Sequence, residues 1–271
     1  MNTIRTAADM RQHVARQRGS HSIGLVPTMG ALHDGHVALF RAARRAAAHV
    51  VATIFVNPHQ FNDPADLAAY PRQESHDLEI ARTAGVDAIF IPAVEEIYPG
   101  GDATSLVVGG AALGFEEEFR PGHFNSVATV CLKLFNIIDP DMAFFGQKDA
   151  QQVAVIRQMI RDLRLNLQIV VVPTVREPDG LALSSRNARL SAADRLRALA
   201  IPRALAAGIV AHTAGTDAVA AARAELDGLR VDYADVAVFD GEPTLVVAAR
   251  AGSTRLIDNV PLRHPDLAGL R

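Results

Sequence analysis

A segment with two histidines has the composition of a phosphate-binding loop. It spans residues 27–36, reads PTMGALHDGH, and separates an apolar run at 22–26 from a helical pattern that begins near Val37. In an open α/β sheet, ligands bind at the carboxyl ends of strands, and the N-terminus of the next helix offers N–H donors and a positive dipole. The imidazole rings of His33 and His36 could each donate a hydrogen bond to a phosphate oxygen. The segment therefore predicts a site for a phosphorylated ligand.

Other interpretations of this segment stay open. Gly30 and Gly35 have the spacing of a P-loop, but His36 and Val37 occupy the positions where that motif requires Lys and Ser or Thr. The GxGxxG pattern of dinucleotide-binding folds is absent as well. The two histidines could instead lie on the surface, cap the helix, or ligate zinc, although a zinc site requires a third ligand in a recognisable arrangement.

A second polar segment follows the next predicted strand. It reads FVNPHQF at residues 55–61, and its Asn57-Pro58 pair ends the strand and turns the chain. This turn would present the Gln60 side chain to the same edge of the sheet as the histidines. Gln60 is therefore a candidate for orienting a substrate, although an ordinary loop amide would give the same pattern.

A third segment brings a positive charge to another strand–helix junction. It reads GQKDAQQ at residues 146–152 and contains Lys148, one of two lysines in a chain with 27 basic residues. An ammonium about 4 Å from a phosphate oxygen contributes roughly 4 kcal/mol at an effective dielectric constant of 20. Gln152 lies one turn further on, where it could line a pocket for an acid. The alternative is a surface lysine beside a helix-capping Asp149.

A fourth segment, within a predicted loop at 176–190, combines hydroxyl groups with a guanidinium. Ser184 and Ser185 precede Arg186 in the stretch LSSRN. Such a group of donors suits a pyrophosphate, and a loop of this kind can close over a bound nucleotide and exclude water. A helix-capping turn before Leu190 is the alternative interpretation.

Short apolar runs alternate with helical patterns over the first two thirds of the chain. Their β-branched composition is typical of parallel strands that are buried on both faces, with helices as the crossovers. Strands are predicted at 22–26, 50–56, 87–91, 142–145 and 168–172. The clearest helical pattern spans 125–138, with Cys131 on its apolar stripe and Lys133 off it. We expect a packed core thiol at Cys131 and a solvated ammonium at Lys133.

The pattern changes after Pro173, which indicates a second domain. Helices near 192–211 and 216–229 precede two or three strands within 231–258, as in a small α+β domain. The sequence thus predicts an α/β fold with a doubly wound parallel sheet over residues 1–174 and a smaller α+β domain over residues 175–271.

The composition favours a small-molecule substrate. The formal net charge is −3 and the sequence pI is about 6.4, so no basic field is available to hold a nucleic acid. A single cysteine excludes an intramolecular disulfide, the N-terminal residues lack the apolar core of a secretory signal, and no apolar run approaches the roughly 20 residues of a membrane helix. We expect a cytoplasmic protein that binds no membrane.

The segments PTMGALHDGH, FVNPHQF, GQKDAQQ and LSSRN, in this order, resemble the pantoate–β-alanine ligase family, the pantothenate synthetases. The stretches at 70–72 (YPR) and 120–124 (RPGHF) are similar to the family as well. This family is a member of the nucleotidyltransferase superfamily that carries the His-x-Gly-His motif. The resemblance implies a Rossmann-like domain that binds ATP and pantoate, followed by a C-terminal lid domain. It also implies Mg2+, a homodimer and a role in coenzyme A biosynthesis.

The resemblance further implies condensation of (R)-pantoate with β-alanine, with ATP cleaved to AMP and pyrophosphate through a pantoyl-adenylate. The residues that it assigns to ATP are Pro27, Thr28, Met29, Gly30, Ala31, Leu32, His33, Asp34, Gly35, His36, Gly146, Gln147, Lys148, Asp149, Val175, Leu183, Ser184, Ser185 and Arg186. His36 would be the proton donor. Gln60 would contact pantoate and β-alanine, and Met29 and Gln152 would also lie at the substrate. Two residues depart from the family pattern: Leu183 replaces the usual Met, and Ser126 the usual Gly.

Charge stabilisation is the catalytic role that these residues suit best. The groups expected to stabilise the transition state from fixed positions are His33, His36, Lys148, Ser184, Ser185 and Arg186. The closest alternative is another adenylyl- or cytidylyltransferase on the same fold, which would leave the nucleotide on its product. A nucleotide-sensing module without turnover is a second alternative. A tRNA synthetase is disfavoured by the acidic balance and by the lack of room for an anticodon-binding domain.

Overall fold

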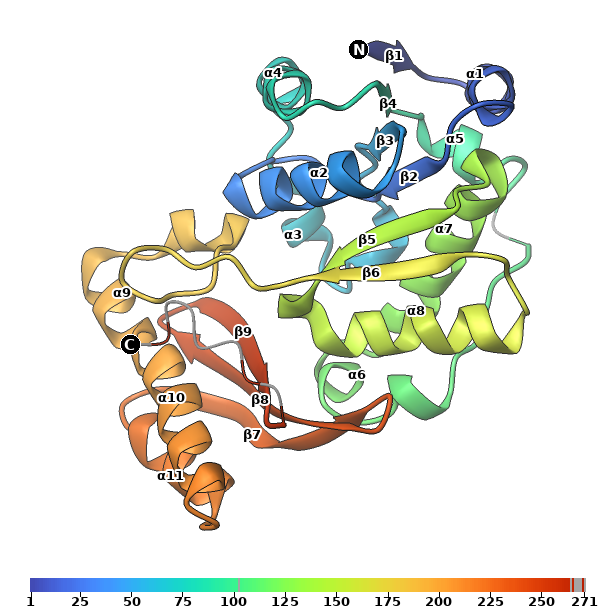
Figure 1. Cartoon of the computed structure of the whole chain (residues 1–271). Coiled ribbons are helices and arrows are strands. Elements are labelled where there is room, and N and C mark those ends of the chain that lie inside the picture. Colours follow the sequence, from blue (N-terminus) through green and yellow to red (C-terminus); the bar gives the residue numbers. More distant parts are fainter. Residues whose placement is uncertain (102, 264, 266–269, 271) are drawn as a thin grey trace. The chain divides into compact units, whose positions relative to one another are not determined.

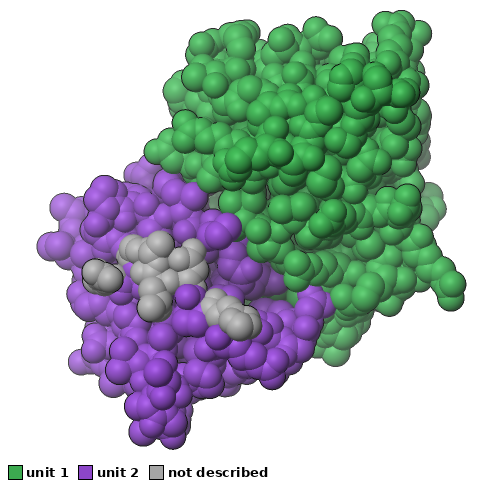
Figure 2. Space-filling model, in the orientation of Figure 1, with its two compact units in different colours: residues 1–145, 151–172 green, residues 146–150, 173–271 purple. Residues whose placement is uncertain are grey.

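The structure is a computed structural model that describes residues 1–101, 103–263, 265 and 270 (Figure 1). The chain divides into two compact units (Figure 2). Unit 1 comprises Met1–Phe145 and Gln151–Val172, and unit 2 comprises Gly146–Ala150 together with the described part of Pro173–Arg271. The segment with Lys148 therefore groups with the C-terminal unit. The division at residue 174 and the roles assigned to its two parts stay predictions.

Unit 1 is built on a six-stranded sheet in the order β1-β4-β3-β2-β5-β6. The strands are β1 (Asn2–Ile4), β2 (Ile23–Val26), β3 (His49–Thr53), β4 (Ala88–Phe90), β5 (Met142–Gly146) and β6 (Gln168–Val172). The pairs from β1 through β5 are parallel. The strand order changes direction at β2, so the carboxyl end of β2 lies at the topological switch point, where ligands bind in such sheets. This arrangement confirms the predicted doubly wound α/β sheet.

Helices cover both faces of this sheet (Figure 1). Their bounds are α1 (Ala7–Arg18), α2 (Asp34–Ala46), α3 (Pro64–Ala68), α4 (Glu74–Thr83), α5 (Val94–Ile97), α6 (Glu116–Phe119), α7 (His123–Ile138) and α8 (Ala150–Asp162). Met10 of α1 and Phe124 of α7 belong to one buried cluster, and Phe40 of α2 and Ala81 of α4 belong to another. Two cores of this kind, one on each face, explain why the central strands are continuously apolar.

Helix α7 confirms one prediction and corrects another. Cys131 is buried in the core, and this burial raises the pKa of its thiol to about 12. Lys133, in contrast, is not a solvated side chain. Its ammonium donates a hydrogen bond to the carbonyl of Ile97 at 3.1 Å and lies 4.6 Å from the ring centroid of Tyr98. The apolar stripe did not reveal this contact because both partners belong to a different segment of the chain.

Unit 2 confirms the predicted small α+β fold. Its sheet is antiparallel in the order β7-β8-β9, formed by β7 (Arg230–Phe239), β8 (Glu242–Ala251) and β9 (Thr254–Pro261). Its helices are α9 (Ala192–Ala198), α10 (Ala200–Thr213) and α11 (Ala218–Glu225). The predicted helix 192–211 is divided at Leu199, because Pro202 has no N–H to donate to the carbonyl of Ala198. Among the described residues, no helix is both long and apolar enough to cross a membrane.

Candidate functional site

The loop that joins β2 to α2 is held in a tight, left-handed conformation. Gly30 and Ala31 have φ angles of 81° and 51°. The Thr28 hydroxyl donates to the carbonyl of Thr53 on the neighbouring strand and accepts from the Gly30 N–H at 3.2 Å. Tyr70, from the predicted YPR stretch, donates to the Gly30 carbonyl at 3.4 Å. The loop is therefore fixed by residues on both sides before any ligand binds.

A buried carboxylate supports the same loop. Asp77, in the first turn of α4, is 1% exposed. Its two oxygens accept hydrogen bonds from the backbone N–H groups of Ala31 at 3.0 Å and Leu32 at 2.8 Å. The sequence analysis missed this residue. An acidic residue near the start of a helix is common, so nothing in the local pattern distinguished it.

The two histidines form a reciprocal cap at the N-terminus of α2. His33 is the N-cap, and its Nδ1 accepts from the Gly35 N–H at 3.1 Å, while Nδ1 of His36 accepts from the His33 N–H at 3.2 Å. The ring centroids lie 4.2 Å apart. In a neutral imidazole the nitrogen that does not accept carries the hydrogen. Each ring therefore has Nε2 as its donor, which is the group that a phosphate oxygen requires.

Several of the N–H groups that the sequence predicted as phosphate donors have partners within the chain. The backbone N–H groups of Gly35 and His33 bond to the two rings, and those of Ala31 and Leu32 bond to Asp77. The helix-capping interpretation of the two histidines is therefore correct. Their role at a phosphate stays a prediction. Gly35 is needed because a Cβ there would lie 2.9 Å from Cε1 of His33.

Gln60 is held in place by a buried amide. It ends the 3-10 turn Pro58–Gln60, and its Oε1 accepts from Nδ2 of the fully buried Asn57 at 2.9 Å. Asn57 Oδ1 in turn accepts from the Tyr98 hydroxyl at 3.0 Å. The Gln60 carbonyl accepts from Nη2 of Arg120 at 3.2 Å. Gln60 is therefore more ordered than an ordinary loop amide. Asn57 and Tyr98 were not recognised as its supports.

The other residues predicted at the substrate, Gln152 and Met29, are only half-buried. Gln152 lies in the first turn of α8, and Met29 lies in the β2–α2 loop. The neighbouring Gln151 is buried and donates to the carbonyl of Gly114 at 3.1 Å, so it supports the segment before α6. Ser126 fits the first turn of α7 by donating its hydroxyl to the carbonyl of Gly122 at 3.1 Å.

Unit 2 contains a pocket with three cations. It is lined by Lys148, Leu181, Ala182, Ser184, Arg186, Ile201, Arg255, Leu256, Ile257 and Asp258. The predicted segments 146–149 and 183–186 thus meet at one pocket. Asn259 of β9 holds the first of them, because its Nδ2 donates to the carbonyls of Gln147 at 3.0 Å and Lys148 at 2.9 Å. Arg255 and Asn259 were missed, since no motif marks them.

The hairpin before this pocket positions the serines. The Leu183 N–H donates to the carbonyl of Val175 at 2.9 Å, and Ser184 caps a 3-10 turn over Ser185–Arg189 by accepting from the Arg186 N–H at 3.3 Å. The helix-capping alternative for this segment is therefore partly correct. Within the described ranges, no group of three or more His, Cys, Asp or Glu side chains could hold a metal ion.

The sheet has a Rossmann-like order and carries His-x-Gly-His in the loop after its central strand, so the protein is of the α/β class that binds ligands at the carboxyl ends of its strands. The model of one family, described as Pantoate-beta-alanine ligase, matches residues 2–261, so the chain belongs to this family. Its activity is the condensation of pantoate with β-alanine using ATP.

Relatives of known name support this membership. The chain is 48% identical to the pantothenate synthetase of Moorella thermoacetica over 98% of this chain and 100% of the relative. It is similar to the crystal structure of the enzyme from Thermus thermophilus, with a TM-score of 0.91, 42% identity and coverage of 97% and 99%. A Francisella tularensis ligase, complexed with beta-gamma ATP and beta-alanine, gives a TM-score of 0.81, 33% identity and coverage of 97% and 98%.

Proposed function

We propose that the condensation proceeds through a pantoyl-adenylate. A carboxylate oxygen of (R)-pantoate forms a bond to the α-phosphorus of ATP, and the bond to the pyrophosphate oxygen breaks. The amine of β-alanine then forms a bond to the pantoyl carbonyl carbon, AMP leaves with the electron pair of the broken C–O bond, and the amine loses a proton to solvent. The observation that carries this proposal is the histidine cap, which fixes two Nε2 donors at the switch point of the sheet.

A covalent enzyme intermediate is not needed for this route. The one cysteine of the chain is buried, and the raised pKa of its thiol keeps it protonated at neutral pH. Catalysis instead rests on charge stabilisation, because negative charge develops on the pyrophosphate as it departs. Donors that are already in place stabilise this charge without reorganisation.

The proposed ATP contacts are those of the family pattern, residues 27–36, 146–149, Val175 and 183–186. His33 and His36 donate from Nε2, with His36 as the proton donor. Lys148, Ser184, Ser185 and Arg186 meet the phosphates. The shared pocket of Lys148, Ser184 and Arg186 supports this assignment, because two cations and a hydroxyl there suit an anion.

The amides of Gln60 and Gln152, with Met29, are proposed to orient the acid. An amide donates hydrogen bonds without the full charge of a guanidinium, so the carboxylate keeps the lone pairs that must attack phosphorus. The Asn57 contact supports a defined orientation of Gln60, since it leaves the Gln60 Nε2 group as the donor.

Mg2+, a homodimer and a cytoplasmic location complete the proposal. Mg2+ keeps several waters and binds through substrate phosphates with one or two carboxylates. The described residues contain no group of three ionisable ligands, which fits an ion that arrives with the triphosphate. It would neutralise charge on the departing pyrophosphate. The family resemblance supports the dimer, and the net charge of −3 supports a soluble protein that binds small molecules.

Exchange of labelled pyrophosphate into ATP tests the adenylate route. The proposal predicts exchange that depends on pantoate, and AMP release only after β-alanine is added. An enzyme that leaves the nucleotide on its product would show exchange but no AMP release with β-alanine. A nucleotide-sensing module would bind ATP without any exchange.

The role of His36 can be tested in the same assay. Loss of one preorganised donor costs about 10²–10³ in rate, so a His36→Ala variant should lose exchange by at least that factor. Near-normal exchange in this variant would refute the assigned role of the ring.

A further inference from the structure

We propose that Asp77 is a positioning residue for the reaction, acting through the β2–α2 loop that presents His33 and His36. This inference rests on the proposed function, in which that loop binds ATP. Asp77 itself belongs to α4 and lies 41 residues beyond His36 in the sequence. It contacts the loop through hydrogen bonds from the backbone N–H groups of Ala31 and Leu32.

The contact has the geometry of an anion held by consecutive amides. One carboxylate oxygen accepts from Ala31 at 3.0 Å and the other from Leu32 at 2.8 Å. Consecutive backbone N–H groups of this kind form anion-binding concavities. Here the protein supplies the anion from its own chain, and the carboxylate is 1% exposed. The two amides are therefore occupied before any nucleotide arrives.

The loop conformation requires such a partner. Ala31 has a φ angle of 51°, a left-handed conformation that non-glycine residues rarely adopt. The Leu32 residue is buried, so its N–H would lack water if the carboxylate were removed. Glycine at position 30 also depends on Asp77, because a Cβ there would lie 2.9 Å from Oδ2. The loop and the carboxylate are thus shaped for one another.

The consequence for chemistry follows from the chain order. His33 comes directly after Leu32, and its backbone N–H holds Nδ1 of His36. A shift of the Leu32 amide therefore moves both imidazoles together. Misplacement of reacting groups by about 1 Å can cost about 10²-fold in rate. Fixing this amide from α4 gives both Nε2 donors their positions.

The two loop N–H groups require two acceptor oxygens, which an Asp side chain provides. Asn at this position therefore makes a suitable test variant. Asn has the same shape but one acceptor and one NH2 group. In an Asp77→Asn variant, the NH2 group would face either the Ala31 N–H or the Leu32 N–H, so one of the two loop contacts would become repulsive. The change removes the positioning without removing any group that contacts the substrates.

The chain offers a matched control at the start of β2, the strand that leads into the loop. The Asp141 Oδ2 accepts from the Ile23 N–H at 2.7 Å, where β2 begins. An Asp141→Asn variant also weakens a carboxylate–backbone contact of β2, but on the edge of the sheet opposite the loop. Both variants and the unmodified chain would be compared by pantoate-dependent pyrophosphate exchange, at a temperature where circular dichroism shows all three to be folded.

The expected result is a loss of about 10²-fold in the kcat/KM of exchange for ATP in Asp77→Asn, with KM for ATP rising more than KM for pantoate, and near-unchanged exchange in Asp141→Asn. Equal losses in both variants, or unchanged exchange in Asp77→Asn, would overturn the proposal. Absence of exchange in the unmodified chain would instead reject the proposed function.

A second measurement does not depend on how well the variant folds. Amide hydrogen exchange of the unmodified, ligand-free protein should show slow exchange at Ala31 and Leu32, because Asp77 occupies both N–H groups. Rapid exchange at these two amides would show that the carboxylate does not hold the loop, whatever the activity of the variant.

Discussion

His33 caps α2 through Nδ1 and is proposed to donate to a phosphate through Nε2, and these two roles can be separated by mutation. Asparagine is among the best N-cap residues, whereas alanine at this position costs about 1 kcal/mol. A His33→Asn variant should therefore keep its stability while pyrophosphate exchange falls by about 10²-fold or more. A His33→Ala variant should lose both. Urea denaturation and the exchange assay would measure the two effects.

The control for this prediction is the comparison between the two variants. If His33→Asn kept most of its exchange activity, the ring would serve only as a cap. If it lost as much stability as His33→Ala, the capping geometry would be wrong. The prediction depends on the 3.1 Å contact between Nδ1 and the Gly35 N–H.

At the residue scale, the sequence indicated the groups that are proposed to carry function and missed the residues that hold them in place. His33, Lys148 and Ser184 stand in motifs with local spacing, so a single segment was enough to identify each. Asp77 and Asn259 act on backbone groups more than 40 residues away. A backbone contact of this kind leaves no pattern in the sequence, because any segment can supply an N–H or a carbonyl.

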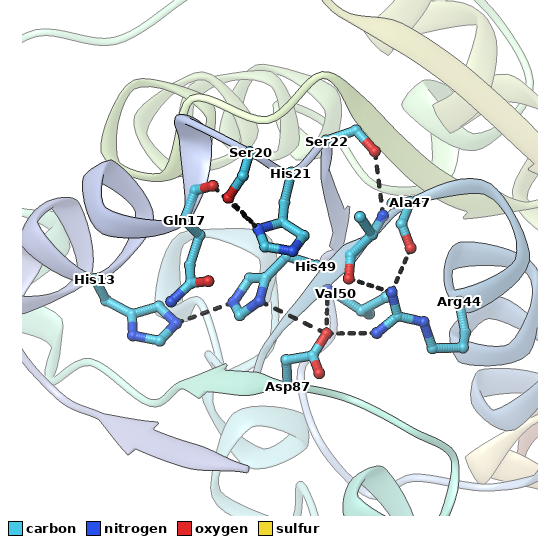
Figure 3. Close-up of polar contacts among 11 residues, drawn as sticks. His13, Gln17, Ser20, His21, Ser22, Arg44, Ala47, His49, Val50 and Asp87 are labelled. Atoms are coloured by element: carbon cyan, nitrogen blue, oxygen red, sulfur yellow. Dashed lines mark hydrogen bonds and ion pairs between the residues drawn. The ribbon is translucent and has the colours of Figure 1, made fainter.

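At the scale of elements, a network of polar contacts surrounds His49 at the start of β3 (Figure 3). His13 of α1 and His49, the first residue of β3, approach each other with their Nε2 atoms 3.0 Å apart. Nδ1 of His49 lies 3.7 Å from the Asp87 carboxylate, and that carboxylate also pairs with Arg44 of α2 at 2.6 Å. Two imidazole nitrogens at hydrogen-bond distance must share one proton between them.

This network predicts a pH dependence of stability. Burial is the main cause that lowers the pKa of both rings. The pKa of His13 is lowered further by Arg16, and that of His49 by His13, Arg44 and His21. The Asp87 carboxylate raises the pKa of both rings but does not outweigh these effects. A lowered pKa means that the unfolded chain binds protons first as the pH falls. The free energy of unfolding should therefore be highest above about pH 6.5 and decrease as the pH falls below it towards the lowered pKa values.

A His13→Leu variant tests this dependence, with His76→Gln as the control because His76 is exposed on α4. Urea denaturation between pH 7.5 and about 5 would give the free energy of unfolding for each protein. The free energy of unfolding should depend less steeply on pH in His13→Leu than in the unmodified chain, and equally steeply in His76→Gln. A slope in His13→Leu equal to that of the unmodified chain would show that the histidine pair does not titrate as expected.

Elements were predictable where both faces of a strand are buried. The run at 22–26, which is buried along its whole length, was located to within a residue. The run at 168–172 was located as well, although β6 is an edge strand that is only half-buried, because four of its five residues are apolar. β1 was missed because it has three residues and is mostly exposed. The strand predicted at 50–56 ends at Thr53, since Ile54 and Phe55 leave the regular ladder to bond with Phe90 and Thr28. The end of a strand depends on such contacts with neighbouring strands, so the ends were predicted less accurately than the strands themselves.

At the scale of the whole molecule, each compact unit has a hydrophobic core of its own. The clusters around Phe124 and Phe40 belong to unit 1, and the cluster around Leu205 and Leu245 belongs to unit 2. Unit 2 also contains a buried ion pair between Arg176 and Asp258, with side chains 6% and 2% exposed and an N···O distance of 2.6 Å. Separate cores favour separate unfolding, because cooperativity requires shared contacts.

We therefore expect calorimetry to show a heat capacity peak that resolves into two transitions. Removing one partner of a buried ion pair costs about 3–5 kcal/mol, so an Asp258→Asn variant should lower the transition of unit 2 and leave that of unit 1 in place. The exposed pair of Arg203 and Glu225, 3.6 Å apart, gives the control, since a Glu225→Gln change should cost about 0–1 kcal/mol. A single two-state peak that shifts as a whole in Asp258→Asn would mean that the two cores unfold as one, and the domain division would then describe packing without independent stability.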